Sequence, residues 1–153
     1  MTLKYLADHP AAIATVAQWY FDQWGYEKEG NDLSKEIENA KLYLNPGSIP
    51  FIVLAMEGEE VLGLAQLKYR EMRIYPEKEH WLGGVYVAAP HRGRGIAARI
   101  IAKITDRAKE LGVKTLYLQT ERLDGGLYAR LGWQPIEQVR YDGHEVLVME
   151  RHL

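Results

Sequence analysis

The sequence has 153 residues, of which 47% are hydrophobic and 26% are charged, as in an ordinary globular domain. It contains no cysteine, which excludes disulfide bonds, zinc–thiolate sites, iron–sulfur clusters and cysteine nucleophiles. The net charge of -2 argues against a protein that binds nucleic acid, and no apolar run is long enough to span a membrane. Because the N-terminus also lacks the pattern of a secretory signal, we expect one cytoplasmic domain over residues 1–153, with neither a membrane nor a nucleic-acid partner.

The first half of the chain alternates between patterns typical of helices and of strands. From Pro10 to Gly25 the apolar residues recur at helical spacing, and the turn NPGSIP stops a second helical segment. Two later runs rich in apolar residues meet at Gly58, which predicts a hairpin. In chain order we expect a strand at residues 3–6, helices at 10–25 and 33–44, and strands at 51–57 and 60–71.

The second half begins with the run HWLGGVYVAA, residues 80–89, which is apolar on both faces and therefore typical of a central strand. A long amphipathic helix is expected next, ended by Gly112. The remaining expected elements are this helix at 95–111, a strand at 114–120, a short helix within 124–132 with Asp124 near its N-cap, and strands at 133–141 and 145–152. The order β-α-α-β-β-β-α-β-α-β-β predicts an α/β domain with a mixed sheet.

The segment HRGRGIAAR, residues 91–99, lies where the central strand gives way to the long helix, and it is poor core material. A Walker A loop is excluded because no lysine followed by serine or threonine closes the glycine segment. GRGIAA fits the shape of a dinucleotide-binding turn, but such a turn belongs to the first βαβ unit and needs an acidic residue after the next strand. Glu121 is too far along the chain to serve as that acid.

The residue types of this turn fit a third interpretation, a cradle for a pyrophosphate at a helix N-terminus. Backbone N–H groups and the helix dipole both favour an anion there. Gly93 and Gly95 would permit the turn and the close approach of phosphate oxygens, and Arg92, Arg94 and Arg99 would add positive charge. A local basic helix on an otherwise acidic chain indicates a small anionic ligand.

Two motifs together resemble the GNAT superfamily of N-acetyltransferases. VYVAAPHRGRGIAARI resembles its central motif, in which Arg or Gln is followed by any two residues, Gly, one further residue, and then Gly or Ala. Arg92, Gly95 and Ala97 fill the three defined positions. LYARLGW, residues 127–133, resembles a later motif with a tyrosine on a short helix. The resemblance covers nearly the whole chain and implies a mixed, mostly antiparallel sheet of six or seven strands flanked by about four helices.

The resemblance also implies acetyl-CoA as cosubstrate, no metal, and a set of binding residues. Backbone groups of the strand before the cradle would pair with the pantetheine arm, and Gly83 and Gly84 in that strand are consistent with a bulge or a close backbone approach. The positions that match the family's coenzyme A site are Val85, Tyr86, Val87, Arg92, Gly93, Arg94, Gly95, Ile96, Ala97 and Ala98.

For the chemistry, Tyr128 matches the family tyrosine that is proposed to protonate the leaving thiolate. The attacking amine must first lose a proton, because a lysine-like amine with a pKa of about 10.4 is neutral in only about one molecule in 2,500 at pH 7. The superfamily has no fixed residue for this step. The candidate bases are Glu79, His80 and Glu121, with Glu71 and His144 as further possibilities.

The acceptor is expected to be a primary amine of a small molecule or peptide, attacked directly in a ternary complex. The first two helices are acidic, which favours a cationic acceptor; their acids are Asp22, Glu27, Glu29, Asp32, Glu36 and Glu38. Two alternatives stay open: a non-catalytic CoA-binding or regulatory module, and a dinucleotide-binding oxidoreductase. The sequence fits both a monomer and a homodimer.

Overall fold

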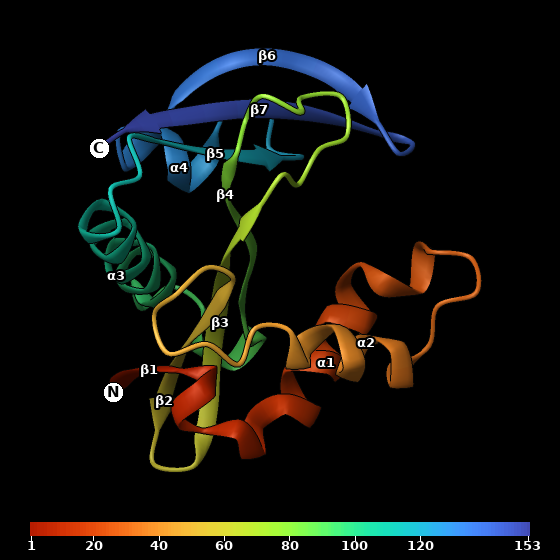
Figure 1. Cartoon of the computed structure of the whole chain (residues 1–153), viewed down its shortest axis with the longest axis vertical. Coiled ribbons are helices and arrows are strands. Elements are labelled where there is room, and N and C mark those ends of the chain that lie inside the picture. The colour runs from red at the N-terminus through yellow and green to blue at the C-terminus, as the bar shows by residue number, and fades with distance from the viewer.

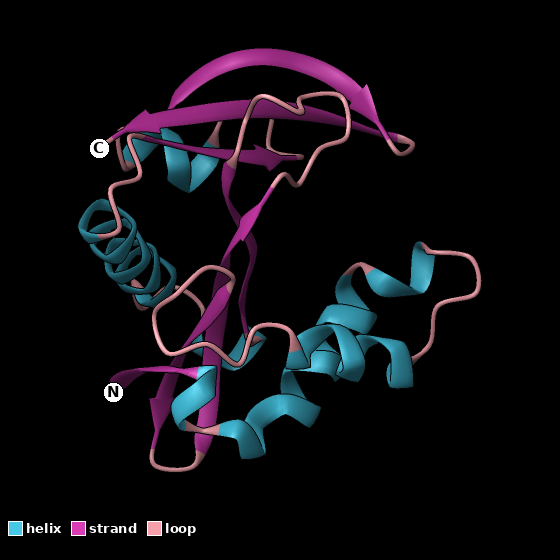
Figure 2. Cartoon of the chain, viewed as in Figure 1, coloured by secondary structure: helices cyan, strands magenta, loops and turns pink.

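A computed structural model describes all residues, 1–153, and contains seven strands and four α-helices in the predicted order (Figures 1 and 2). Short 3-10 turns lie between some of them, as at Pro10–Ala12, Gly25–Glu27 and Ala89–His91. The elements are β1 (Thr2–Tyr5), α1 (Ile13–Gln23), α2 (Leu33–Lys41), β2 (Phe51–Glu57), β3 (Glu60–Tyr69), β4 (His80–Val87), α3 (Ile96–Glu110), β5 (Thr115–Thr120), α4 (Gly126–Arg130), β6 (Gln134–Tyr141) and β7 (His144–His152).

All seven strands form one sheet in the order β1-β2-β3-β4-β5-β7-β6. Every neighbouring pair is antiparallel except β4 and β5, which are parallel. β4 is the fourth of the seven strands, so the central position predicted from its two apolar faces is confirmed. The fold class, a mixed and mostly antiparallel sheet with four helices, is confirmed as well.

Both faces of the sheet are covered, and strand β2 shows how its sequence achieves this. Its residues alternate between the two faces, as the two-residue period of a strand requires. Phe51, Val53 and Ala55 join the core under α3, while Ile52, Leu54 and Met56 join the core under α1 and α2. Figure 1 shows α3 on one side of the sheet and α1 with α2 on the other.

The long helix α3 packs as its pattern predicts. Its apolar stripe is fully buried, and it consists of Ile96, Ile100, Ile101, Ile104 and Ala108. These residues recur every three or four positions, so they share one face of the helix and leave the basic residues on the other. Burying each isoleucine contributes about 1.5–3 kcal/mol to folding, which fixes α3 firmly against the sheet.

Element boundaries differ from the predictions by a few residues, each for a local reason. The first helix becomes α-helical only at Ile13, because the residues from Pro10 form a 3-10 turn. The second ends at Lys41 instead of residue 44, where the backbone changes to i→i−3 bonds. The N-cap of α4 is Gly125, in the left-handed region, and the side chain of Asp124 instead accepts from the backbone N–H of Gly126.

None of the helices is both long enough and apolar enough to cross a lipid bilayer.

Candidate active site

The parallel strands β4 and β5 open into a wedge at the centre of the sheet. They are paired at only one position, Trp81 opposite Tyr117, and diverge beyond it. From Leu82 to Val87, strand β4 therefore has no strand partner on the side of β5. Its backbone N–H and C=O groups on that side are free to pair with an extended ligand, as an edge strand would.

A β-bulge lies in this unpaired part of β4. Gln66 of β3 pairs with Gly83 and Leu64 pairs with Tyr86, so two residues of β4 stand opposite one residue of β3. Gly84, with φ of 56°, is one of these two residues of β4. The prediction that the paired glycines mark a bulge or a close approach is thus confirmed.

The side chain of Tyr20, from α1, holds the bulge in place. Its hydroxyl donates to the carbonyl oxygen of Gly84 at 2.9 Å. A Cβ atom at Gly84 would lie 2.5 Å from that hydroxyl oxygen, so only glycine fits between the strand and the ring. Burial raises the pKa of Tyr20 well above its usual value, and the hydroxyl therefore stays a donor. Sequence reasoning missed this contact because the helical pattern of α1 assigns Tyr20 to the core.

At the end of β4 the chain turns into the N-terminus of α3 through two left-handed glycines. Gly93 has φ of 79° and Gly95 has φ of 74°, and a Cβ atom at either position would meet nothing within 4 Å. The backbone N–H groups of residues 93–98 donate to no acceptor within the chain. Six consecutive free donors at the positive end of a 15-residue helix are an arrangement that can hold an anion.

The three arginines around this turn point in different directions. The Nε of Arg92 donates to the carbonyl of Val87 at 2.9 Å, and its guanidinium lies over the ring of Tyr86, 5.5 Å from the centroid. The guanidinium of Arg94 instead pairs with the carboxylate of Glu57 on β2, at 3.3 Å. Arg99 lies one turn into α3 and lines a different groove, next to β1. Of the three, Arg92 is the one that contacts the strand beside the wedge.

Tyr128 lies on the short helix α4 and packs against the core under α3. Its ring meets Trp133 edge-on, with centroids 6.4 Å apart. Burial, with a smaller effect from the negative charge of Glu71, raises the pKa of Tyr128 to about 12. The hydroxyl is therefore neutral over the whole physiological range and can donate a hydrogen bond without itself ionising.

Among the acidic candidates, Glu71 is the one in electrostatic contact with Tyr128. It follows β3, is only 15% exposed, and its Oε1 would lie 3.0 Å from a Cβ atom at Gly83, beside the bulge. Lys68 pairs with it at 2.8 Å. Burial lowers the pKa of Lys68, but the charge and hydrogen bond of Glu71 outweigh this and raise it, so Lys68 stays charged.

Glu79 and His80 lie at the start of β4, away from the bulge. Glu79 is half-exposed and faces Arg70 at 3.8 Å. His80 packs on Tyr69, with ring centroids 5.5 Å apart, and faces a small pocket beside the end of α3. His80 stands four positions before Gly84 in the strand, a distance of about 13 Å. The structure therefore does not bring these two candidates to the wedge.

Glu121, which directly follows β5, contacts His144. His144, at the start of β7, lies between two carboxylates: its Nδ1 is 2.9 Å from Glu121 and its Nε2 is 2.8 Å from Glu27, in the turn after α1. The hydrogen bond to Glu27, then the charges of both carboxylates, raise the pKa of His144. This bridge joins the β6–β7 hairpin to the segment between α1 and α2, which lie at the same side of the molecule in Figure 1.

The other acidic residues of the first two helices mostly have local partners. Asp32 caps α2 by accepting from the N–H of Lys35, and Glu38 pairs with Lys41. Asp22 accepts from Gln18, and Glu36 accepts from Asn31. Glu27 is the member of this acidic set that reaches across to the C-terminal half.

The tryptophans are mainly packing residues. Trp81 and Trp133 are buried, and Trp19 packs on Tyr86, whereas Trp24 is 40% exposed. The indole nitrogen of Trp133, beside Tyr128, is the one buried side-chain polar atom with no hydrogen-bond partner. No group of three or more histidine, cysteine, aspartate or glutamate residues is arranged to hold a metal ion.

Comparison with known proteins agrees with this geometry. The model of the acetyltransferase (GNAT) family matches residues 13–133. The chain is 35% identical over 63 residues to the uncharacterized N-acetyltransferase YobR of Bacillus subtilis (strain 168). That match covers 39% of this chain and 26% of YobR, so it spans about a quarter of the relative's length.

Solved structures show the same fold over nearly the whole chain. An aminoglycoside 6'-N-acetyltransferase complexed with coenzyme A superposes with a TM-score of 0.76 at 16% identity, covering 99% of this chain and 97% of that one. A ribosomal-protein-alanine N-acetyltransferase from Brucella melitensis superposes with a TM-score of 0.73 at 21% identity, covering 100% of both chains. Their two acceptors differ, so the shared fold does not determine the acceptor. Because the family model matches most of this sequence, residues 13–133, the chain belongs to the GNAT family of N-acetyltransferases, as its two motifs predicted.

Proposed function

We propose that the chain transfers an acetyl group from acetyl-CoA to a primary amine by direct attack in a ternary complex. The proposal rests on how three features of the fold are placed. Six free N–H groups at the start of α3 adjoin an unpaired stretch of β4, and Tyr128 packs against the same core. A phosphate-bearing, extended thioester would match the free donors and the unpaired strand together.

The coenzyme would lie along this path. The N–H groups of residues 93–98 would hold the pyrophosphate, with Arg92 beside them, and the backbone of Val85–Val87 would pair with the pantetheine arm. When bound, acetyl-CoA supplies the activated thioester carbonyl. The bulge at Gly84 changes the direction of the β4 backbone just where this arm would end, and Tyr20 holds the bulge in place.

Tyr128 would assist the departing thiolate as a hydrogen-bond donor. Since its pKa is about 12 and that of a free thiol is about 8.5, complete proton transfer from Tyr128 is unfavourable. A hydrogen bond to the developing negative charge needs no such transfer and is worth about 1.5–3 kcal/mol. Removing it should lower the rate of acetyl transfer roughly 10- to 150-fold.

We assign the acceptance of the amine proton to Glu71. Its carboxylate is partly buried beside the bulge and pairs with Lys68 at 2.8 Å. A carboxylate there would attract the incoming ammonium and take a proton from it, directly or through water, before the neutral amine attacks the thioester carbonyl. Because the chain has no cysteine, an acyl-cysteine intermediate is impossible, which supports direct transfer.

We propose that the acceptor is cationic. Glu27 and Glu121 carry two negative charges at one end of the site, and the chain itself places an imidazole between them. An acceptor with a second positive group would find a complementary environment there. A polyamine, an aminoglycoside and a basic peptide all satisfy this description.

The experiment is an amine-panel assay for release of the CoA thiol, run in parallel with Tyr128→Phe. We expect turnover with cationic amines, sequential kinetics, and a kcat about 10- to 150-fold lower in the variant with little change in KM. Parallel double-reciprocal lines, or a variant equal to the parent at saturation, would contradict the mechanism. Stabilisation by acetyl-CoA without turnover of any amine would indicate a non-catalytic CoA-binding module, and stabilisation by NAD alone would indicate a dinucleotide-binding protein.

A further inference from the structure

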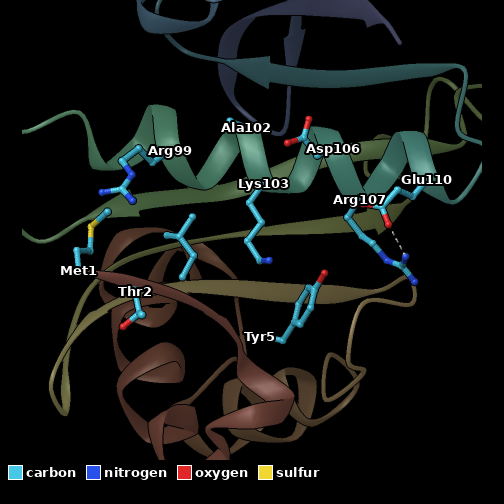
Figure 3. A pocket seen from close by; sticks show the side chains of 10 residues that line it. Met1, Thr2, Tyr5, Arg99, Ala102, Lys103, Asp106, Arg107 and Glu110 are labelled. Carbon is cyan, nitrogen blue, oxygen red and sulfur yellow. Dashed lines mark hydrogen bonds and ion pairs between the residues drawn. The ribbon is translucent and has the colours of Figure 1, made fainter.

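A second concave surface lies on the far side of α3 from the wedge. It is a groove of about 610 Å³ between strand β1 and the outer side of α3 (Figure 3). Leu3 and Tyr5 line it from β1, and Arg99, Lys103 and Arg107 line it from α3. None of its lining residues belongs to the glycine turn, the bulge or α4, so the groove has no part in the proposed acetyl transfer.

The groove carries positive charge that the chain does not neutralise. Neither Arg99 nor Lys103 has a carboxylate oxygen within 4.0 Å, and the Nζ of Lys103 instead lies 5.0 Å from the centre of the Tyr5 ring. Asp106 and Glu110 also line the groove, but the carboxylate of Asp106 points away from β1 in Figure 3 and Glu110 pairs with Arg107. Arg107, in contrast, is occupied: its Nε donates to the carbonyl of Gly47 and its NH1 pairs with Glu110. Two unpaired cations therefore face the open part of the groove.

The floor of the groove is the edge of the sheet. β1 is the first strand in the sheet order and pairs only with β2, so its outer edge has no strand partner. Such an edge offers unpaired backbone groups to an extended segment. A segment added there would place alternate side chains about 6.6–6.8 Å apart on the face toward α3.

This spacing matches the cations above it. Arg99 and Lys103 are four residues apart on α3, which separates them by about 6.0 Å along the helix. They lie side by side above β1 in Figure 3, pointing to the same side of the helix. Carboxylates at alternate positions of an added strand would therefore each find one cation.

We propose that the groove between β1 and α3 binds an acidic segment of another protein in extended conformation, added as a strand to β1. Backbone hydrogen bonds to β1 would provide binding, and Arg99 and Lys103 would select acidic side chains at alternate positions. A second copy of this chain is a poor occupant. Its own β1, TLKY, carries Lys4 and no acid, so pairing of two β1 strands would bring cations together.

The proposal is tested by fluorescence anisotropy with a labelled octapeptide that has glutamate at alternate positions and threonine between them. Its controls are the same peptide with lysine for glutamate, and one with a central proline, which cannot complete the strand. The protein variants are Arg99→Gln/Lys103→Gln and, as the matched control, Lys109→Gln/Lys114→Gln, which removes two exposed cations outside the groove. Thermal denaturation establishes that both variants are folded.

We expect saturable binding of the glutamate peptide only, weakened by salt and weakened roughly 2- to 30-fold in the groove variant but not in the control variant. Amide signals of β1 should shift in NMR spectra when the peptide is added. Equal binding of the proline peptide, equal loss in both variants, or equally tight binding of a short oligonucleotide would overturn the proposal. So would a dimer, detected by sedimentation, that the groove variant converts to a monomer.

Discussion

Replacing Gly84 by alanine should destabilise the protein more than the same substitution at a left-handed glycine whose surroundings are open, such as Gly58. At φ of 56° a side chain costs about 1–2 kcal/mol in backbone strain. The new Cβ would also lie 2.5 Å from the Tyr20 hydroxyl oxygen and would push it away from the Gly84 carbonyl. Leaving that carbonyl without its partner costs about 1–3 kcal/mol more. The sum is about 2–5 kcal/mol of unfolding free energy.

Gly58 provides the matched control for this substitution. Its φ is 60°, yet a Cβ atom there would meet nothing within 4 Å, so Gly58→Ala isolates the backbone strain. With a shift of about 2–4 °C per kcal/mol for a chain of this size, Tm should fall by roughly 2–8 °C in Gly58→Ala and by roughly 4–20 °C in Gly84→Ala. Differential scanning calorimetry measures both. Equal Tm values for the two variants would refute the claim that Tyr20 and the bulge are packed against each other.

Two further predictions concern charged groups around the wedge. Glu71→Gln should lower kcat/KM by roughly 10²- to 10⁴-fold. Glu79→Gln, which changes a carboxylate away from the bulge, should leave kcat/KM unchanged, and equal losses in the two variants would contradict the assignment of Glu71. His144 should titrate above its usual value of 6.5 in an NMR pH series, because Glu27 and Glu121 favour the imidazolium. Since the folded-state pKa is the raised one, the bridge stabilises the protein fully below about pH 6.5 and weakens as the pH rises through the raised value. In Glu27→Gln the His144 pKa should fall, and an unchanged titration would show that the bridge does not form in solution.

Much of the fold could be predicted because each element carries its own local signal. The buried face of α3 follows from isoleucines at helical spacing, and the central position of β4 follows from its two apolar faces. The turn before α3 could be predicted in the same way, since Gly93 and Gly95 stand where the chain enters the left-handed region. These features depend on neighbours in sequence, so one sequence contains enough information to find them.

The side-chain partnerships across the wedge could not be predicted in the same way. Tyr20 and Gly84 are 64 residues apart, and His144 lies 117 residues from Glu27. No periodic pattern links such pairs, because each contact depends on how β4, β5 and the hairpin are placed in three dimensions. For this reason the sequence did not rank Glu71 above Glu79, although one lies at the bulge and the other does not.

The basic residues show a similar limit. Counting charges around the turn suggested that Arg92, Arg94 and Arg99 act together. In the fold, Arg94 pairs with Glu57 and Arg99 faces β1, because successive positions on a turn and a helix point in different directions. Charge composition predicted that the region binds an anion, but only the backbone geometry shows which groups are available to hold it.

The central claim is that the glycine turn before α3 holds the pyrophosphate of acetyl-CoA. Isothermal titration calorimetry of acetyl-CoA binding to Gly95→Ala and to Gly112→Ala tests it directly. Both glycines are left-handed, with φ of 74° and 85°, and neither would bring a Cβ atom within 4 Å of another group, but they lie at opposite ends of α3. We expect Gly95→Ala to weaken acetyl-CoA binding about tenfold or more, because its Cβ and altered backbone disturb the free N–H groups, while Gly112→Ala binds like the parent. Equal affinities for the parent and both variants would contradict the account.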